Sequence, residues 1–557
     1  MLHKRTLCAA LAMIFALSFC ACGKTNEEDP TKTYLRIGNF DGGVGHVWLE
    51  NAIADFQREY SDFEFEPGSG KKGCVIEIYN KKDEYTGATL QGNMPYYKED
   101  LYFLNDIEYK SFVSAGVLAD ITSIVTADVY DNEANLVGDS GTLSIVDNIK
   151  DSALADYFNV GTKAEPKYYG LPFQTAIGGI TYDADLFDEY GLYFKDDNGT
   201  LGATQADIDA GKCSKGPDGK LGTYDDGMPN TWNQFISLMN RMLVKGITPF
   251  TWSGANTYQR NFACYSVWSS YEGYNDFMLN QSFSGTNAKG EVITETNAYQ
   301  LADQQGRKAM LQFCYDIVSN TKYYSSVAFN GTQTHTQAQK EFVYSINTNE
   351  RIAMLLEASW WENETRSTFD SMSKLDSEWG YGKRNFRILP IPKFVGVAGL
   401  EDQVNEDSVM FSVGGKSLTC VNNATVTQRS EKMLLVEKFL QFIHQRSQMA
   451  NFSRDTSCLK PFNYEFTNPE RDSLTNYMKS ILDMYSAGTK VTYALDSMNV
   501  YKGANKTYFE KWNFGTQVGA NVYNEPLTAF HENEGLTVDA YFNGIKSLYN
   551  QNTWPIK

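Results

Sequence analysis

The stretch YLRIGNFDGGVGHVWLENAIADFQREYSDF, residues 34–63, decides the class of fold. Its first seven residues alternate apolar and polar side chains, with Leu35 and Ile37 on one face, which predicts a half-buried strand. The glycine-rich turn at 41–45 then leads into a segment whose apolar residues recur at helical spacing. The pattern therefore predicts a strand, a tight turn and an amphipathic helix, in that order.

A second apolar segment, VIEIYN at residues 75–80, follows this predicted helix after a glycine-rich loop. Strand, helix and strand in this order are typical of a parallel βαβ unit. Later segments predict further helices, namely 232–245, which begins with the capping-box pair Thr231 and Gln234, and 431–446. We therefore expect an α/β fold.

The length and composition indicate a large globular protein. A chain of 557 residues exceeds what one hydrophobic core usually supports, so two domains or one two-lobed body are expected. Hydrophobic residues make up 42% and charged residues 21% of the chain, which is typical of folded proteins. Aromatic residues make up 14%, and this favours contact with the apolar faces of sugar rings as well as core packing.

Charge, histidine and cysteine content argue against three classes of site. The net charge of −19 disfavours nucleic acid as a partner, because phosphate binding requires clustered Lys and Arg. The five histidines are scattered without an HExxH spacing, so neither a catalytic zinc site nor a histidine-based triad is indicated. The later cysteines are widely spaced without a CxxC pair, which predicts buried thiols or an incidental disulfide rather than a metal cluster.

Residues 1–21 are predicted to be a signal peptide. Two basic residues precede an apolar run at 7–21, which is about as long as a signal-peptide core and too short to span a bilayer. Ala21 directly before Cys22 resembles the lipobox of bacterial lipoproteins, in which the cysteine thiol receives a diacylglyceryl group. This resemblance implies a lipid-anchored protein with a tether at 22–33, on the extracytoplasmic face of the cell membrane. An ordinary cleaved signal is the alternative.

Six segments resemble, in order along the chain, the bacterial extracellular solute-binding proteins of family 1, which are maltose-binding-protein-like components of carbohydrate ABC importers. Their shared order across most of residues 34–465 carries the resemblance. The segments are NFDGGVGHVWLENAIADFQREYSDF (39–63), YYGLPFQTAIGGITYDADLFDEYGL (168–192), MPNTWNQFISLMNRMLVKGITPF (228–250), AMLLEASWWENE (353–364), FRILPIPKFVG (386–396) and SVGGKSLTCVNNAT (412–425).

The resemblance implies two α/β lobes of the class II periplasmic-binding-protein type, which close around a ligand and are joined by three crossing segments. The crossings are expected near residues 171–177, 408–415 and 485–495. The expected lobes are an N-terminal lobe at 34–172 plus 409–485 and a C-terminal lobe at 173–408 plus 486–557. The implied partners are a small-molecule carbohydrate and the permease subunits of an ABC transporter, and the protein is expected to be a monomer.

Trp360 and Trp361 follow the apolar strand IAMLLE, where this family commonly carries an aromatic ligand contact. Because neighbouring strand residues face opposite ways, only one of them is expected to reach the cleft, and Trp360 is the better match. Two core tryptophans are the alternative. Glu362 beside them, Asp106 and Trp252 are further ligand-binding candidates, with solvent exposure or core packing as the other interpretation of the last two.

The glycine turn and the crossing segments supply the remaining ligand-binding candidates. Asp41 and Gly43 open the first helix, where backbone amides would point into the cleft, and a plain tight turn is the alternative. Gln174 beside the first crossing and Gly414 at the second are placed where family members line the site. A hinge role without ligand contact is the competing interpretation of both residues.

The loop GPDGKLGTYDDGMP at 216–229 is a candidate calcium site. It places Asp218, Asp225 and Asp226 among glycines and so offers the hard oxygen ligands that calcium prefers. The spacing is not that of an EF-hand and lacks its terminal glutamate, so an Asp-Gly turn with solvated carboxylates is the alternative. No other cofactor is indicated.

These observations predict a lipid-anchored receptor that captures a carbohydrate, in particular an oligosaccharide, by lobe closure and delivers it unaltered to an ABC import permease. Enzyme activity is not expected. Two alternatives stay open. A cell-surface glycoside hydrolase needs two carboxylates across a cleft, and the 68 acidic residues supply enough for a chance pair. A glycan-adhesion protein would bind sugar without a transport partner.

Overall fold

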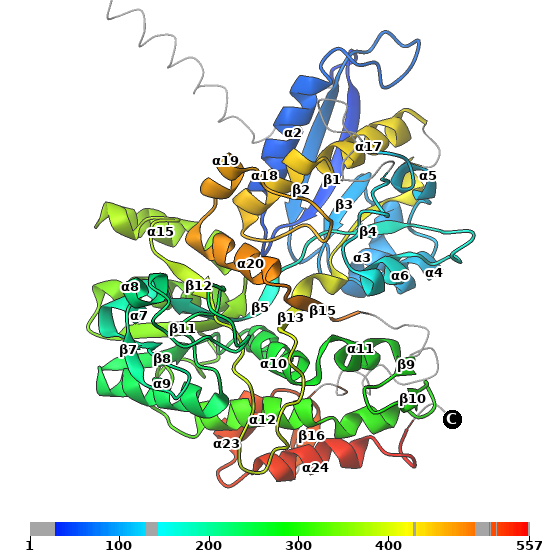
Figure 1. Ribbon diagram of the computed structural model, residues 1–557. Helices are drawn as coiled ribbons and strands as arrows, with labels where there is room; N and C mark the ends of the chain where they lie inside the picture. The colour runs from blue at the N-terminus through cyan, green and yellow to red at the C-terminus, as the bar shows by residue number, and fades with distance from the viewer. Residues whose placement is uncertain are drawn as a thin grey trace, which may run out of the picture.

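The computed structural model describes residues 28–129, 143–426, 430–495, 512, 514–519 and 521–554. The predicted signal peptide at 1–21 and Cys22 lie outside the described residues, so export and lipidation remain predictions. Among the helices of the described ranges, none is long and apolar enough to cross a membrane. The described chain forms two α/β lobes, each built on its own sheet (Figure 1).

The first lobe is built on a five-stranded sheet in the order β2-β1-β3-β14-β4. Strands β1 and β2 pair in parallel along their whole length, and helix α2 connects them, which confirms the predicted βαβ unit. The alternation predicted for β1 is observed, since Leu35 and Ile37 are fully buried. The strands are β1 (Thr33–Phe40), β2 (Cys74–Lys81), β3 (Leu101–Leu104), β4 (Gly170–Pro172) and β14 (Leu418–Val421).

Helices α2, α17 and α18 pack together beside this sheet (Figure 1). The contact is aromatic: Trp48 of α2 meets Phe452 of α18, and Phe56 of α2 meets Phe439 of α17. These helices are α2 (Val47–Glu59), α17 (Ser430–Ile443) and α18 (Arg446–Thr456), and the shorter helices of this lobe include α3 (Gly87–Asn93), α4 (Tyr109–Ser114), α5 (Thr122–Val125), α6 (Ser152–Phe158) and α16 (Asn423–Val426).

The second lobe is built on a sheet in the order β15-β13-β5-β11-β8, with β12 paired to β5. Every residue of β5 is buried, as expected for a central strand covered on both faces. The strands are β5 (Ile177–Asp183), β8 (Ile247–Thr251), β11 (Arg351–Ala358), β12 (Phe386–Ile388), β13 (Val409–Ser412) and β15 (Lys490–Tyr493).

The helices of the second lobe include the predicted one that begins after Thr231. In α9 the Thr231 hydroxyl and the Gln234 side chain form the complete capping box, which confirms that prediction. The other principal helices are α7 (Ala184–Tyr190), α10 (Thr257–Glu272), α11 (Tyr274–Ser282), α12 (Gln305–Val318), α13 (His335–Tyr344), α14 (Trp361–Glu364), α15 (Arg366–Ser373) and α20 (Asn476–Ser486), with α9 itself at Trp232–Val244.

The chain passes from one sheet to the other between β4 and β5 and returns between β13 and β14. A later passage lies between α18, which packs on α2, and α20, which packs on β12. This passage comes earlier in the chain than the third crossing expected at 485–495. Strand β13 lies in the second sheet, whereas the expected N-terminal lobe includes residues 409–485. Because β13 and β14 are both short and fully buried, their sequences do not reveal which sheet each joins. The exact lobe boundaries stay a prediction.

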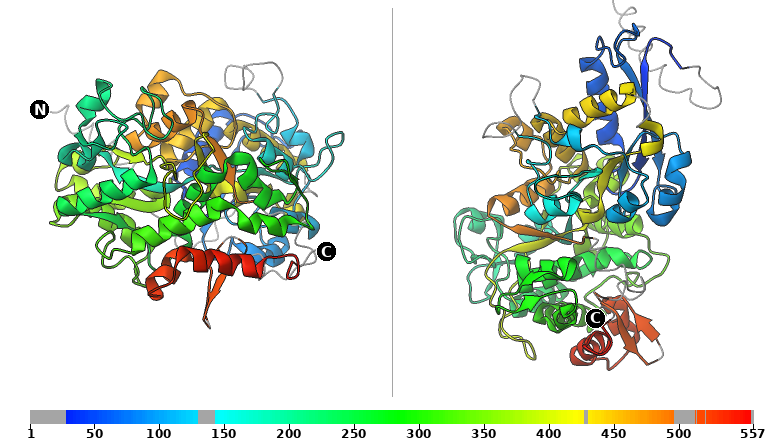
Figure 2. Two further views of the ribbon diagram at one scale, coloured as in Figure 1. Left: turned by 60° about the horizontal axis from the view of Figure 1, so that its bottom comes forward. Right: turned by 90° about the vertical axis from the view of Figure 1, so that its right-hand side faces the viewer.

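A C-terminal segment, residues 512–554, packs against the second lobe. Helices α23 (Pro526–Glu532) and α24 (Val538–Leu548) lie on α12, and the short hairpin β16 (Thr516–Val518) and β17 (Asn521–Tyr523) lies beside them. Figure 2 shows this segment in red at the end of the second lobe that is remote from the first sheet.

Candidate functional site

A cavity of about 570 Å³ lies between the two lobes, and both contribute to its lining. The first lobe supplies the glycine turn that follows β1, including Gly42 and Gly43. The return crossing between β13 and β14 supplies Val413 and Ser417. The second lobe supplies the widest wall, which is centred on α10. The volume is within the range of roughly 300–1,000 Å³ that small-molecule sites occupy.

Helix α10 forms an aromatic wall of this cavity. Tyr258, Phe262 and Tyr265 all line it, at the spacing of four and three residues that brings side chains to one face of a helix. Phe262 meets Trp360 edge to face with ring centroids 6.1 Å apart, and Tyr265 stacks on Phe411 at 4.4 Å. The wall therefore consists of two aromatic groups, one around Trp360 and one around Phe411.

Three polar atoms on the residues of this wall have no hydrogen-bond partner within the described part of the chain. They are Gln259 Oε1, Asn261 Oδ1 and Trp360 Nε1, and each is buried. A buried polar group without a partner costs about 1–3 kcal/mol. All three residues line the cavity, and the three atoms themselves are enclosed by the surrounding protein.

The glycine turn of the first lobe is bonded directly to helix α14 of the second. The Gly43 N–H donates to Glu364 Oε1 at 2.9 Å, and Asn363 Nδ2 donates to the carbonyl oxygens of Gly43 and Val44 at 3.3 and 3.1 Å. Gly43 has φ +64, and a Cβ atom there would lie 3.2 Å from the Trp360 ring. The turn therefore needs glycine both for its backbone conformation and for its close approach to Trp360.

Glu364 also belongs to a buried polar cluster behind the cavity. Gln339 Nε2 donates to Glu364 Oε2 at 2.8 Å, and His335 Nε2 lies 3.8 Å from Glu364 Oε1. Burial lowers the pKa of His335, although the Glu364 charge opposes this shift. Burial and the neighbouring Glu364 raise the pKa of Glu357 well above its usual value. Glu364 is thus held in place by donors from both lobes.

The model of the bacterial extracellular solute-binding protein family matches residues 83–477, which is more than half of the chain. The chain belongs to this family. A search of curated proteins found no match.

Solved structures of sugar-binding proteins are similar to this solute-binding protein over almost its whole length. RafE in complex with raffinose is 15% identical with a TM-score of 0.54, and the match covers 94% of this chain and 100% of RafE. The apo form of RafE from Streptococcus pneumoniae is 15% identical with a TM-score of 0.53, covering 95% and 100% of the two chains. A chitin oligosaccharide binding protein is also 15% identical, with a TM-score of 0.53, covering 94% and 100%. At this identity the likeness establishes the two-lobed fold.

Of the ligand-binding residues predicted from the sequence, Trp360, Gly43 and Asp106 line the cavity of this solute-binding protein. Gln174 lies directly behind the lining, since its Nε2 donates to Asn105 Oδ1 at 2.8 Å, and Asn105 lines the cavity. Gly414 packs between the crossings, where a Cβ atom would lie 2.0 Å from the Gln174 carbonyl oxygen. Both residues hold the crossings together at the cavity.

Four other predicted residues lie outside the cavity lining. Trp361 is fully buried among Phe342, Phe386 and Tyr477 in the core. Glu362 accepts hydrogen bonds from Ser457 and Thr475, and burial raises its pKa to about 7.

Trp252 packs in the core against Tyr324 and Phe329. Asp41 Oδ1 lies 2.9 Å from His46 Nδ1. The strand ends at Ala358, so Trp360 lies on the turn before α14 and Trp361 is the first residue of that helix, and only Trp360 lines the cavity.

The candidate calcium loop is stabilised by its own hydrogen bonds. Asp225 accepts from the Asp218 N–H at 2.8 Å and from the Thr223 hydroxyl at 2.7 Å, and Asp226 accepts from the Gly222 N–H at 2.7 Å. Burial raises the pKa of Asp225 to about 7. Nowhere in the described ranges do three or more His, Cys, Asp or Glu side chains converge as metal ligands would. Calcium binding stays a prediction, which equilibrium dialysis with calcium tests directly.

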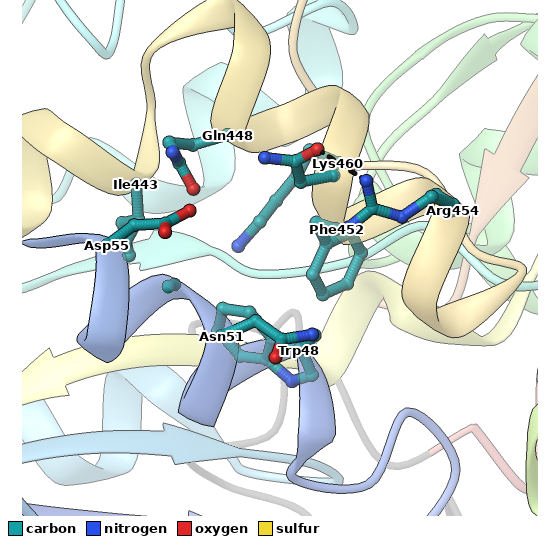
Figure 3. A pocket seen from close by; sticks show the side chains of 10 residues that line it. Trp48, Asn51, Asp55, Ile443, Gln448, Phe452, Arg454 and Lys460 are labelled. Atoms are coloured by element: carbon teal, nitrogen blue, oxygen red, sulfur yellow. Dashed lines mark hydrogen bonds between the residues drawn. The ribbon is translucent and has the colours of Figure 1, made fainter. Parts of the chain in front are cut away.

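A small pocket of about 20 Å³ in the first lobe holds the ammonium of Lys460 (Figure 3). The side chain is 2% exposed, and its Nζ lies 4.5–5.0 Å from the ring centroids of Trp48, Phe173 and Phe452. Its Nζ has no hydrogen-bond partner among the residues that the structure describes, and burial lowers its pKa to about 7. The pocket has room for water rather than for a sugar, so it is not a second ligand site.

The α10 residues of the cavity were missed by sequence reasoning. The spacing of Tyr258, Phe262 and Tyr265 is visible in TYQRNFACYSVWSSYE, but four of the residues between them, Gln259, Arg260, Ala263 and Cys264, are buried too. Arg260 and Cys264 on the other side of the helix are also buried. A helix buried on both sides shows no single apolar stripe, so the sequence did not distinguish the face toward the cavity.

Proposed function

We propose that this solute-binding protein captures a carbohydrate of oligosaccharide size in the cavity between its lobes and delivers it unaltered to an ABC import permease. The observation that carries the proposal is the combination of aromatic and amide side chains on one wall of the cavity. Trp360 and Phe262 supply aromatic rings that meet edge to face, and Gln259 and Asn261 supply amide groups.

The physical reason is the mixed surface of a sugar. A pyranose ring has apolar C–H faces that pack on aromatic rings and a rim of hydroxyls that need hydrogen-bond partners. Gln259 and Asn261 lie next to the cavity-lining aromatic residues of α10 and add amide groups to the same wall. Polar groups on the wall of a binding site favour ligands that can form hydrogen bonds with them.

The comparisons support the same class of ligand. One similar structure is described as RafE in complex with raffinose, and another as a chitin oligosaccharide binding protein. The cavity volume of about 570 Å³ also favours a ligand larger than one sugar unit. These proteins share the fold with this chain at low identity, so the individual sugar has to be found by experiment.

Two features of the proposal rest on the sequence. The lipobox-like Ala21 and Cys22 after an apolar run support a lipid anchor on the extracytoplasmic face. Membership of the solute-binding family supports an ABC permease as the partner that receives the sugar. A monomer is sufficient for this role, because both lobes that line the cavity belong to one chain.

The carboxylates on the cavity favour binding over hydrolysis. A glycoside hydrolase needs two carboxyl groups free to act on the sugar. The Glu364 carboxylate accepts hydrogen bonds from the Gly43 N–H and the Gln339 side chain. The Asp106 side chain is 86% exposed, and its carboxylate lies 3.7 Å from Lys416 Nζ. These two are the carboxylates on the lining that the structure describes.

A thermal-shift screen against mono- and oligosaccharides tests the proposal. A ligand that binds the folded state raises the melting temperature with its concentration. We expect at least one oligosaccharide to do so and to be recovered intact after incubation. Cleavage of chromogenic glycosides would instead support a hydrolase, and binding without any effect of the protein on sugar uptake by cells would support a glycan-adhesion protein.

A further inference from the structure

The C-terminal segment, residues 512–554, lies beyond the end of the family match at 477 and yet reaches the cavity. Phe514 and Asn524 of this segment line the cavity together with the residues of α10. Phe514 is 4% exposed, so its ring is almost fully enclosed. The segment is therefore a part of the cavity wall that the family match does not include.

The segment is fixed to the outer side of α10 and α12 by buried arginines. Arg260 of α10, which is 2% exposed, donates to both carboxylate oxygens of Glu525 at 2.9 and 2.7 Å. Arg307 of α12 donates to the Trp512 carbonyl oxygen at 2.6 Å. Because Glu525 follows Asn524 directly, the bidentate pair holds Asn524 at the cavity.

A hydrogen bond to its backbone also fixes the position of Phe514. The Tyr541 hydroxyl of α24 donates to the Phe514 carbonyl oxygen at 2.7 Å. The Phe514 ring lies against the Tyr265 ring, with centroids 4.7 Å apart, and Tyr265 in turn stacks on Phe411. Phe514 therefore extends the aromatic group around Phe411, which is the group that does not contain Trp360.

The two aromatic groups are separated along α10. Phe262, which contacts Trp360, and Tyr265, which contacts Phe514, are three residues apart, which is about 4.5 Å along a helix that rises about 1.5 Å per residue. Trp360 and Phe514 thus contact different residues of α10, about one helical turn apart, and the sugar unit next to the one at Trp360 is the one that faces Tyr265 and the C-terminal segment.

We infer that the C-terminal segment completes a second sugar subsite, in which Tyr265, supported from behind by Phe514, packs on a ring face and Asn524 binds hydroxyls of a unit different from the one at Trp360. This inference rests on the proposed function and adds that the chain beyond the family match determines which length of glycan is preferred. The ligand class is an oligosaccharide of at least two units.

Calorimetric titration of Phe514→Ala and Phe542→Ala with the best glycan of the screen tests the inference. The two phenylalanines belong to the same segment and are each 4% exposed, but Phe542 does not line the cavity. Both variants should unfold at a lower temperature because each loses a buried ring. Only Phe514→Ala should weaken binding, by about tenfold, the size expected for one aromatic contact.

A second pair of variants keeps the test valid if Phe514→Ala does not fold. Asn524→Ala should weaken binding, whereas Asn533→Ala in the same segment should not, since the Asn533 side chain donates to the Ala529 carbonyl oxygen of α23 and does not line the cavity. Shorter members of the same glycan series that bind should lose less affinity in Phe514→Ala than the longest member.

The outcomes separate this inference from the proposed function. If the wild-type chain binds no glycan, the proposed function fails first. If it binds one and Phe514→Ala and Asn524→Ala bind it as tightly as wild type, the second subsite is refuted while the receptor function stands. An equal loss of affinity for the shortest and longest members would also refute it.

Discussion

The Gly43 N–H and the Glu364 carboxylate are hydrogen-bonded at 2.9 Å although they are 321 positions apart in the chain. Gly43 belongs to the turn after the first strand of one lobe, and Glu364 to the short helix α14 of the other. The bond therefore joins the lobes at the cavity itself. Both residues also line the cavity, so the proposed closure of the lobes around a ligand would depend on this bond.

Removal of the Glu364 carboxylate should weaken ligand binding. A hydrogen bond to a charged group contributes about 1.5–3 kcal/mol, so Glu364→Ala should lower affinity about ten- to hundredfold. Glu364→Gln keeps an oxygen that can accept from Gly43 and should retain most of the affinity. Titration calorimetry measures both. Wild-type affinity in Glu364→Ala would mean that this bond does not contribute to closure.

Gly43→Ala should weaken binding more than Gly45→Ala. Both glycines have positive φ, at +64 and +66, so each alanine carries the same backbone penalty of about 1–2 kcal/mol. At Gly43 the new methyl group would also lie 3.2 Å from Trp360, whereas at Gly45 the nearest atom is 3.7 Å away on Asn363. Gly43→Ala should therefore lower both the melting temperature without ligand and the affinity more than Gly45→Ala does. Equal affinities would contradict the contact between the turn and Trp360.

The neighbouring tryptophans should respond to substitution in opposite ways. Trp360→Ala should lose most of the ligand-induced thermal shift and keep a melting temperature near that of wild type without ligand. Trp361→Ala should unfold at a lower temperature, because truncation of a buried tryptophan costs about 3–5 kcal/mol. Retention of the full ligand shift by Trp360→Ala would place the sugar elsewhere.

Lys460→Met should stabilise the protein most at low pH. The pKa of Lys460 is lowered from 10.5 to about 7 by burial, so between these values the unfolded chain binds more protons than the folded one. The contribution of Lys460 to the free energy of unfolding is therefore lowest below pH 7 and rises as the pH increases toward 10.5. Above pH 10.5 this contribution no longer depends on pH. Melting temperatures of wild type and Lys460→Met at pH 6 and pH 9 should differ more at pH 6. A difference that does not change with pH would show that the ammonium is not destabilised by burial.

Local patterns predicted much of the fold. The alternation in β1, the helix after the glycine turn and the capping box of Thr231 are determined by neighbouring residues, so they are visible in the sequence. The sequence did not predict which sheet β13 joins, because a short buried strand fits either sheet.

The candidate site was predicted only where a local signal marks it. Trp360 follows a strong apolar strand, and Gly43 lies in a distinct glycine turn. Phe514 reaches the cavity through contacts with Tyr265, about 250 residues earlier, and no local pattern indicates that contact. Long-range packing of this kind is set by the assembled lobes rather than by sequence spacing.

Calorimetric titration of the wild-type chain and Trp360→Ala with the best oligosaccharide, followed by mass spectrometry of the recovered sugar, tests the central claim most directly. We predict saturable binding of one glycan per chain, at least tenfold weaker binding in the variant, and an unchanged ligand mass. Binding that is equally tight in both proteins, or a ligand recovered in cleaved form, would contradict the account.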